Sequence, residues 1–117
     1  MLKRHLENNH KLSESETTAI YQNLENLVHW ESKLHVLQCL SYLLIPKPDK
    51  SGVETFLRNC LMEENKFVRA WAYNGFYELS VQYPEYAEET RQFFEMAMRD
   101  EAPSVQSRIR NILKKDF

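Results

Sequence analysis

The residues that could carry chemistry are few and scattered. His29 and His35 are six residues apart, so they do not share one face of a helix. Glu31 and His35 are four apart and can touch, but two ligands do not make a metal site, so we interpret them as a surface pair. His5 and His10 lie in a polar segment near the start of the chain. We therefore expect no bound metal and no cofactor.

The motifs of common enzymes are also missing from the sequence. It contains no HExxH, no CxxC and no glycine-rich phosphate loop. With two glycines in the chain, a backbone nest for phosphate is not expected. No serine or cysteine triad can be assigned, so no catalytic residue is named and the chain is predicted not to be an enzyme.

The two cysteines, Cys39 and Cys60, each sit within a helical apolar pattern. We interpret both as reduced thiols of the core. The alternative is a single disulfide, which would imply an oxidising compartment.

The composition indicates which elements must position these side chains. The chain has 117 residues, of which 43% are apolar, and it has only two glycines and four prolines. Sheet proteins use glycine in their many turns, so this composition favours long helices with few loops. We predict one all-α domain.

The predicted helices fall into hairpins. Residues 1–12 form a polar arm, either frayed or a short helix, and the remaining residues, 13–117, form a single domain. Its hairpins cover about 13–45, 51–83 and 84–115. Ser13 to Glu16 and Ser51 to Glu54 are capping boxes that open the first helices of two hairpins. Short turns predict antiparallel neighbours.

Within the hairpins, most expected boundaries follow from prolines and turns. The first helix should run to about Val28, the second from about Ser32 to Leu44, and the fourth from about Lys66 to Gln82. Pro84 and Pro103 should open the last two helices. The expected core stripes are Ile20, Leu24, Leu27 and Val28; Val53, Phe56, Leu57, Cys60 and Leu61; Val68, Ala72, Gly75, Phe76 and Leu79; Phe93, Phe94, Ala97 and Met98; and Val105, Ile109, Ile112 and Leu113.

An internal repeat supports the hairpin model. A shift of 37 residues brings Val53 and Phe56 onto Thr90 and Phe93, and Val68 and Ala72 onto Val105 and Ile109. Both helices of the second hairpin thus match the third in one register. The first hairpin matches the second at shifts of 32 to 33 residues. The alternative is that any two amphipathic helices align at some shift.

The segment Phe67-Val68-Arg69-Ala70-Trp71-Ala72, which follows an acidic turn, resembles the second helix of a HEAT repeat. The segment that begins at Pro103 is similar, with Gln106 in place of the arginine usual in that family. The resemblance covers roughly residues 14–115. It implies a short right-handed α-solenoid of about three antiparallel hairpins of the HEAT or armadillo type, used mostly to bind proteins.

The candidate binding site is the side of the second helices that faces away from the core stripe. This concave face would carry two tyrosines and little charge on the helix from Lys66, and tyrosine is enriched at interfaces. The alternative is that the tyrosines pack against the arm or an adjacent helix. The candidate residues are Gln38, Ser41, Tyr42, Tyr73, Asn74, Tyr77, Arg110 and Lys114.

We therefore predict a non-enzymatic scaffold or adaptor for a protein partner. The alternative is a nucleic-acid-associated protein with a basic concave face, distantly like the DNA alkylation-repair HEAT proteins. Its phosphate contacts would be Lys33, Arg69 and Arg108, with Arg110 and Lys114. The net charge of -2 is not that of a typical nucleic-acid binder.

Two further expectations concern location and assembly. The N-terminus lacks the apolar core of a signal peptide, and the apolar run near Val36 to Ile45 is too short to span a bilayer, so we expect a cytoplasmic protein without a membrane partner. The last helix ends in Asp116-Phe117 without an obvious cap, so the end of the stack could pair with a second copy as a homodimer.

Overall fold

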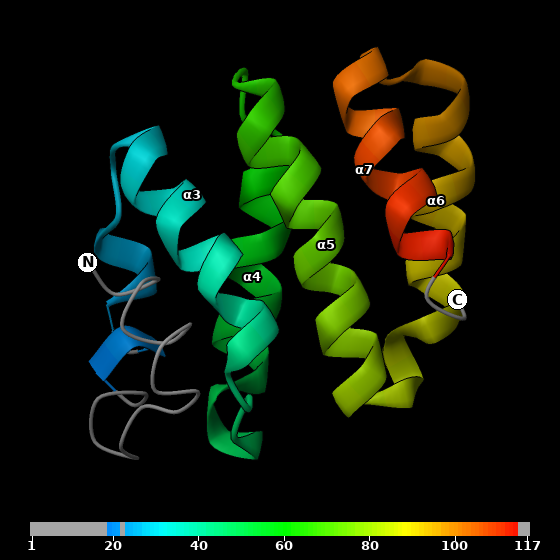
Figure 1. The fold of residues 1–117 in the computed structure, drawn as a ribbon. Coiled ribbons are helices and arrows are strands. Elements are labelled where there is room, and N and C mark those ends of the chain that lie inside the picture. The colour runs from blue at the N-terminus through cyan, green and yellow to red at the C-terminus, as the bar shows by residue number, and fades with distance from the viewer. Residues whose placement is uncertain (1–18, 22, 115–117) are drawn as a thin grey trace.

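The computed structural model describes residues 19–21 and 23–114, except for the side chains of Glu25 and Ser41 (Figure 1). Helices account for the regular structure of this part of the chain, and none of it is a strand, which confirms the all-α prediction. The arm of residues 1–12 and the capping box at Ser13 to Glu16 lie outside the described residues.

Residues 19–21 are helical, and the later part of the described chain forms the α-helices α3 to α7, with short 3-10 helices before and between them. The 3-10 helices are Leu24–Asn26, Leu40–Tyr42, Lys47–Asp49 and Pro84–Tyr86. The α-helices are α3 (Trp30–Cys39), α4 (Lys50–Leu61), α5 (Lys66–Gln82), α6 (Ala87–Asp100) and α7 (Pro103–Leu113).

The boundaries of α5 are those predicted, and a side-chain cap explains its start. The side-chain oxygen of Asn65 accepts hydrogen bonds from the backbone N–H groups of Phe67, at 2.9 Å, and Val68, at 3.2 Å. These bonds satisfy two of the amides that the first turn of a helix leaves without a partner. Pro103 opens α7, also as predicted. Proline has no backbone N–H, and at the first position of a helix that group would have no partner within the helix.

Other predicted boundaries are wrong. Ser51 does not cap α4, because the 3-10 helix before it leads directly into α4 at Lys50 and residue 51 is already helical. α3 begins at Trp30 and ends at Cys39, where the chain tightens into a 3-10 turn instead of continuing to Leu44. The chain also leaves helical geometry after Asn26, so Val28 is 79% exposed rather than part of the core.

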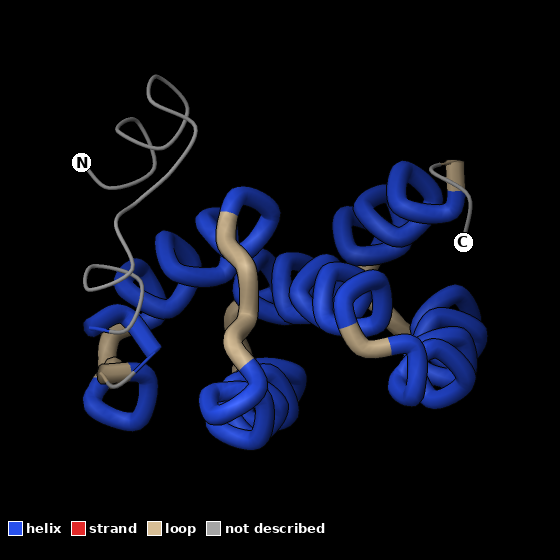
Figure 2. Tube along the Cα trace, turned by 90° about the horizontal axis from the view of Figure 1, so that it is seen from below, coloured by secondary structure: helices blue, strands red, loops and turns tan. Residues whose placement is uncertain are grey.

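The helices lie in two layers. Figure 2 shows α3, α5 and α7 side by side in one layer, with α4 and α6 in the other. α5 lies in the middle and contacts α3, α4, α6 and α7. α5 is therefore packed against other helices on more than one face, whereas a helix with a single core stripe is packed on one.

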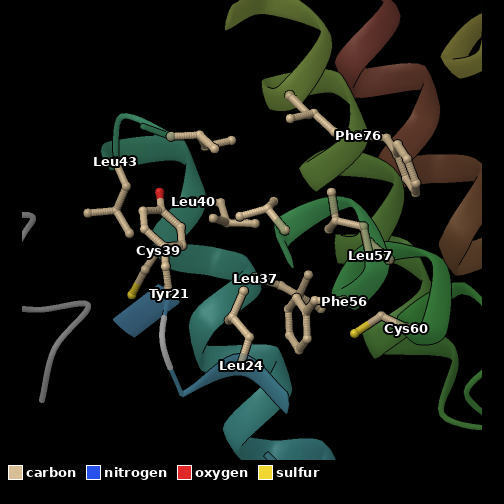
Figure 3. Packing of buried hydrophobic residues seen from close by; sticks show 14 of the residues in the cluster. Tyr21, Leu24, Leu37, Cys39, Leu40, Leu43, Phe56, Leu57, Cys60 and Phe76 are labelled. Atoms are coloured by element: carbon tan, nitrogen blue, oxygen red, sulfur yellow. The ribbon is translucent and has the colours of Figure 1, made fainter. Parts of the chain in front are cut away.

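The core consists of two apolar clusters, one on each side of α5. The larger cluster joins α3, α4 and α5 and is shown in Figure 3. The smaller cluster includes Ala70 and Tyr73 of α5 and packs them against α6 and α7. At Gly75 the helices come so close that a Cβ atom would overlap the Leu57 side chain of α4, so any larger residue here would require Leu57 to shift.

Residues 43–46, which follow the 3-10 helix after α3, are held in place by hydrogen bonds from side chains. The amide of Gln82 accepts from the Ile45 N–H at 2.7 Å and donates to the Leu43 carbonyl at 3.1 Å. The Tyr83 hydroxyl donates to the Ile45 carbonyl at 2.6 Å. The Tyr21 hydroxyl donates to the Leu44 carbonyl at 2.7 Å. These bonds satisfy backbone groups that have no helix or strand to pair with.

A polar network joins α4 to the third hairpin. Arg58 bonds Glu54 within its own helix at 3.0 Å and both carboxylate oxygens of Glu89 at 2.7 and 3.2 Å. The Tyr86 hydroxyl donates to Glu54 at 2.5 Å. This hydrogen bond is the main reason that the pKa of Glu54 lies below its ordinary value, and Arg58 adds to the effect while burial opposes it.

This lowered pKa predicts how stability depends on pH. A carboxyl group with a pKa lowered by folding stabilises the protein above its unfolded pKa of about 4.3, and the contribution is lost as the pH falls through the folded-state pKa. We expect the free energy of unfolding of Glu54→Gln, measured by urea unfolding, to fall less steeply than that of the wild type between about pH 6 and about pH 3. Glu88→Gln is the control, because Glu88 is exposed and only weakly paired with Arg91 at 3.9 Å. The same decrease in the free energy of unfolding with falling pH for the wild type and Glu54→Gln would contradict the prediction.

Candidate protein-binding surface

The candidate surface is the outward side of the layer of α3, α5 and α7. On α5, positions 67, 71, 74, 78 and 81 follow one another every three or four residues and so form one stripe, in which Asn74 is buried. Phe67 and Val81 are exposed, and Trp71 is half-buried. We define the α3–α5–α7 surface as Gln38 and Tyr42 of α3 and the turn after it, the stripe residues Phe67, Trp71, Glu78 and Val81 of α5, and Arg108 of α7.

The centre of the α3–α5–α7 surface is a cation–π pair. The guanidinium carbon of Arg108 lies 4.2 Å from the centroid of the Trp71 ring. Trp71 also packs against the larger core cluster, so its side chain is partly anchored in the protein. Phe67 lies one turn before Trp71, and the Lys66 amine stands 5.6 Å from the Phe67 ring centroid. One exposed and one partly exposed aromatic ring, each beside a cation, are suited to contact with another protein.

The tyrosine-bearing face predicted from the sequence is not an open surface. Tyr73 and Asn74 are buried, and the Tyr73 ring meets Phe94 of α6 edge-on at 6.2 Å between centroids. Burial raises the pKa of Tyr73 to about 12. The physical reason is that α6 and α7 cover the side of α5 opposite its core stripe, so the alternative of packing against an adjacent helix holds for Tyr73. Tyr77 is half-buried against the smaller apolar cluster, which joins α5 to α6 and α7.

The other predicted residues lie at separate places. Gln38 is half-buried and Tyr42 is exposed, both at the α3 side of the layer, and the side chain of Ser41 is outside the described part. Arg110 is exposed on α7, and Lys114, the residue that follows α7, is exposed as well. In the 37-residue register they take the places of Tyr73 and Tyr77, whose side of α5 is covered by the third hairpin. The structure therefore does not gather the eight residues into one stripe.

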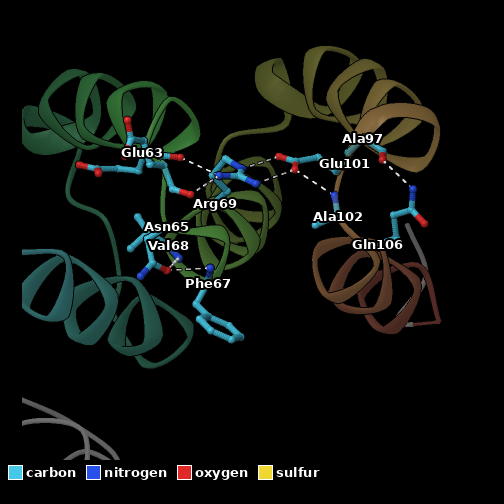
Figure 4. Close-up of polar contacts among 10 residues, drawn as sticks. Glu63, Asn65, Phe67, Val68, Arg69, Ala97, Glu101, Ala102 and Gln106 are labelled. Atoms are coloured by element: carbon cyan, nitrogen blue, oxygen red, sulfur yellow. Dashed lines mark hydrogen bonds and ion pairs between the residues drawn. The ribbon is translucent and has the colours of Figure 1, made fainter.

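The cations proposed as phosphate contacts are engaged within the protein. Lys33 forms an ion pair with Glu63. Arg69 bonds both carboxylate oxygens of Glu101, at 2.9 and 3.1 Å, and donates to the carbonyls of Glu63 and Glu64, each at 2.8 Å (Figure 4). With Arg108 stacked on Trp71, these three cations do not form an isolated basic patch.

Sequence reasoning missed Trp71 as the centre of a surface, although a signal for it was present. The 37-residue shift places position 71 on position 108, and equivalent positions of neighbouring second helices lie beside each other. Phe67 and Trp71 are also an aromatic pair at the spacing of one helical turn. Trp71 and Arg108 could have been paired on these grounds.

A separate cavity of about 540 Å³ lies where the first 3-10 helix meets α4. It is lined by Tyr21, Leu24, Leu27, Lys33, Gly52, Thr55, Phe56, Asn59 and Cys60. Cys60 is buried, and burial raises its pKa to about 12, so this thiol stays protonated and is a poor nucleophile. Cys39 is buried as well, and neither thiol forms a disulfide, which confirms the prediction of two core thiols.

The described residues hold neither a cluster of metal ligands nor a membrane-spanning helix. Residues 19–21 and 23–114 contain no group of three or more His, Cys, Asp or Glu side chains placed to hold a metal ion. Within the same ranges, no helix has the length and apolar character needed to cross a bilayer.

Comparison of the chain with protein-family models, with curated proteins and with solved structures finds no match. The function therefore has to be inferred from the contacts, exposure and charges of the chain's own residues.

Proposed function

We propose that the chain is a short right-handed α-solenoid of HEAT-like hairpins that binds a partner protein through the α3–α5–α7 surface. The arrangement of helices supports the architecture. α5 contacts the helix before it and the helix after it in its own layer, as well as α4 and α6 in the other layer. These are the neighbours that the second helix of a middle hairpin has in a stack.

The polar contacts between hairpins also support the stack. Lys33, near the start of α3, pairs with Glu63 in the turn before α5, and Arg69, near the start of α5, pairs with Glu101 in the turn before α7. Gln106 takes the place of Arg69 in the 37-residue register. Its amide donates to the carbonyls of Met98, at 3.1 Å, and Ala97, at 3.4 Å, so it binds only its own hairpin. No described residue after α7 offers Gln106 a later turn.

The observation that carries the binding proposal is the Trp71–Arg108 pair between two exposed apolar residues of one stripe. Phe67 and Val81 lie on either side of it along α5 and are exposed. Tryptophan and arginine dominate the energetic centres of protein interfaces, because they offer a large contact area together with a polar or charged group. Exposed apolar residues aligned with such a centre add area that a partner can bury.

The test is a pull-down from the source cell with the tagged full chain and a Phe67→Ala/Trp71→Ala variant. We expect the variant to recover the specific partner at least tenfold less, as a loss of about 1.4 kcal/mol or more requires. Quantitative mass spectrometry of the recovered proteins gives the ratio. Far-UV circular dichroism and urea unfolding check that the variant remains folded, because Trp71 also contacts the core.

The matched control is Met62→Ala/Met96→Ala, which also removes two exposed apolar side chains, at the end of α4 and on α6. It should recover the partner as well as the wild type does. Undiminished recovery by the Phe67→Ala/Trp71→Ala variant would reject the surface. A partner that disappears after nuclease treatment of the lysate would instead favour the nucleic-acid alternative.

A further inference from the structure

The C-terminal end of the stack carries a groove that is distinct from the α3–α5–α7 surface. It lies between α6 and α7, has a volume of about 450 Å³ and is lined by Arg91, Phe94, Glu95, Met98, Arg99 and Leu113. Leu113 was expected in the core stripe of α7, but it is 43% exposed. Its equivalent in the 37-residue register is Phe76, which is buried because α6 covers it. Leu113 is exposed because no described element follows α7 to cover it.

The equivalent groove inside the protein shows what such a surface binds. Between α4 and α5 the equivalent positions include Glu54, Arg58 and Phe76, and one face of the third hairpin's first helix fills them. Tyr86 bonds Glu54 at 2.5 Å, Glu89 bonds Arg58 at 2.7 Å, and the Phe93 ring meets Phe76 at 5.1 Å between centroids.

The inner ligand is thus one face of one helical segment. Positions 86, 89 and 93 are spaced i, i+3 and i+7, a single helical face. The inner groove thus binds a polar group at Glu54, an acidic group at Arg58 and a large apolar side chain at Phe76, in that order along the helix.

At the end groove the apolar position is kept but the two charges are exchanged. The 37-residue shift carries Glu54 to Arg91, Arg58 to Glu95 and Phe76 to Leu113. A helix like α6 would bring its acidic position 89 against the carboxylate of Glu95. Like charges in contact disfavour that complex, so the chain's own helix sequence is the wrong ligand for this groove.

We propose that the groove between α6 and α7 binds an amphipathic helix of a partner protein with the opposite charge order. That helix places an acidic residue near Arg91, a lysine or arginine three positions later against Glu95, and a large apolar residue four positions after that on Leu113 and Met98. The exposed Arg99 at the rim adds attraction for acidic residues that flank this motif. The site lies on α6 and α7, so it can be occupied while Phe67 and Trp71 bind another segment.

The test uses two synthetic helical peptides with the sequence of residues 84–99, stapled on the face away from positions 86, 89 and 93. One keeps the chain's own sequence and the other carries Tyr86→Glu and Glu89→Lys. Binding to the full chain is measured by fluorescence anisotropy, and the site is mapped by NMR on the methyl groups of Met98 and Leu113. We expect the exchanged peptide to bind at least tenfold more tightly and to shift these methyl signals.

The Arg91→Glu/Glu95→Arg variant of the full chain reverses the charges of the groove without changing the buried Phe94. It should reverse the preference between the two peptides, with circular dichroism verifying the fold. Equal affinities in both proteins, or shifts confined to the α3–α5–α7 surface, would overturn the proposal. Concentration-dependent dimer formation by the chain alone that Leu113→Glu abolishes would also overturn it, because a second copy would then be the occupant. The proposed function is unaffected by these outcomes, since Phe67 and Trp71 are unchanged.

Discussion

Phe76→Ala is expected to lower the free energy of unfolding by about 3–5 kcal/mol, the usual cost of truncating a buried phenylalanine. The side chain is fully buried, with 0% exposure. Its ring meets Phe93 of α6 edge-on at 5.1 Å between centroids, and the Arg58 guanidinium lies 5.7 Å from its centroid. Truncation removes these contacts and leaves a cavity between α4, α5 and α6. The total free energy of unfolding of a native protein is about 5–15 kcal/mol, so this loss is a large part of it.

Urea unfolding followed by circular dichroism measures this loss. Phe67→Ala is the matched control, because it is the same substitution in the same helix at a side chain that is 50% exposed. We expect it to cost at most about 1 kcal/mol, in keeping with its surface position. A similar loss for both variants would mean that the buried contacts of Phe76 with Phe93 and Arg58 do not contribute to stability as argued.

Arg69→Ala is expected to cost about 2–4 kcal/mol, between the loss of one hydrogen bond to a charged group and the loss of one partner of a buried ion pair. The side chains of Arg69 and Glu101 are 20% and 15% exposed, so the pair is only partly screened by water. Removing the guanidinium leaves the Glu101 carboxylate and the carbonyls of Glu63 and Glu64 without this donor. The hydrogen bonds to Glu101 are also the main reason that the pKa of Arg69 is raised, which means that folding favours its charged form.

Two further variants separate the parts of this contact. Arg69→Gln copies Gln106, so it can retain bonds to its own turn while it loses the ion pair, and it should be less harmful than Arg69→Ala. Combining Arg69→Ala with Glu101→Ala should cost less than the sum of the single losses, because the residues share one interaction. Arg91→Ala is the control, since its pair with Glu88 is long and exposed, and should cause no measurable loss. Strict additivity of Arg69→Ala and Glu101→Ala would refute the coupling.

Local sequence signals predicted the helices well where the signal is itself local. The apolar period and flanking turn fixed both ends of α5, and Pro103 fixed the start of α7. Ser51 shows the limit of such signals. A serine followed three residues later by glutamate predicts a cap, but the segment before it was already helical, and a cap requires a non-helical residue at that position.

Exposure could not be predicted in the same way, because it depends on how many neighbours a helix has. Tyr73 lies away from the core stripe of α5, and a helix with one buried face would expose it. α5 has buried faces on two sides, so Tyr73 is buried and the exposed stripe is turned toward Phe67 and Trp71. Leu113 shows the converse, since it continues the apolar stripe of α7 at a place that no described element covers.

The position of α5 between the two apolar clusters has a consequence for how the protein comes apart. α3 lies only on the first cluster and α7 only on the second, so either can detach and leave the opposite cluster closed. α5 supplies side chains to both, so its detachment opens the whole interior at once. Partial unfolding therefore starts at α3 or α7, and the opening of α5 coincides with complete loss of the native state.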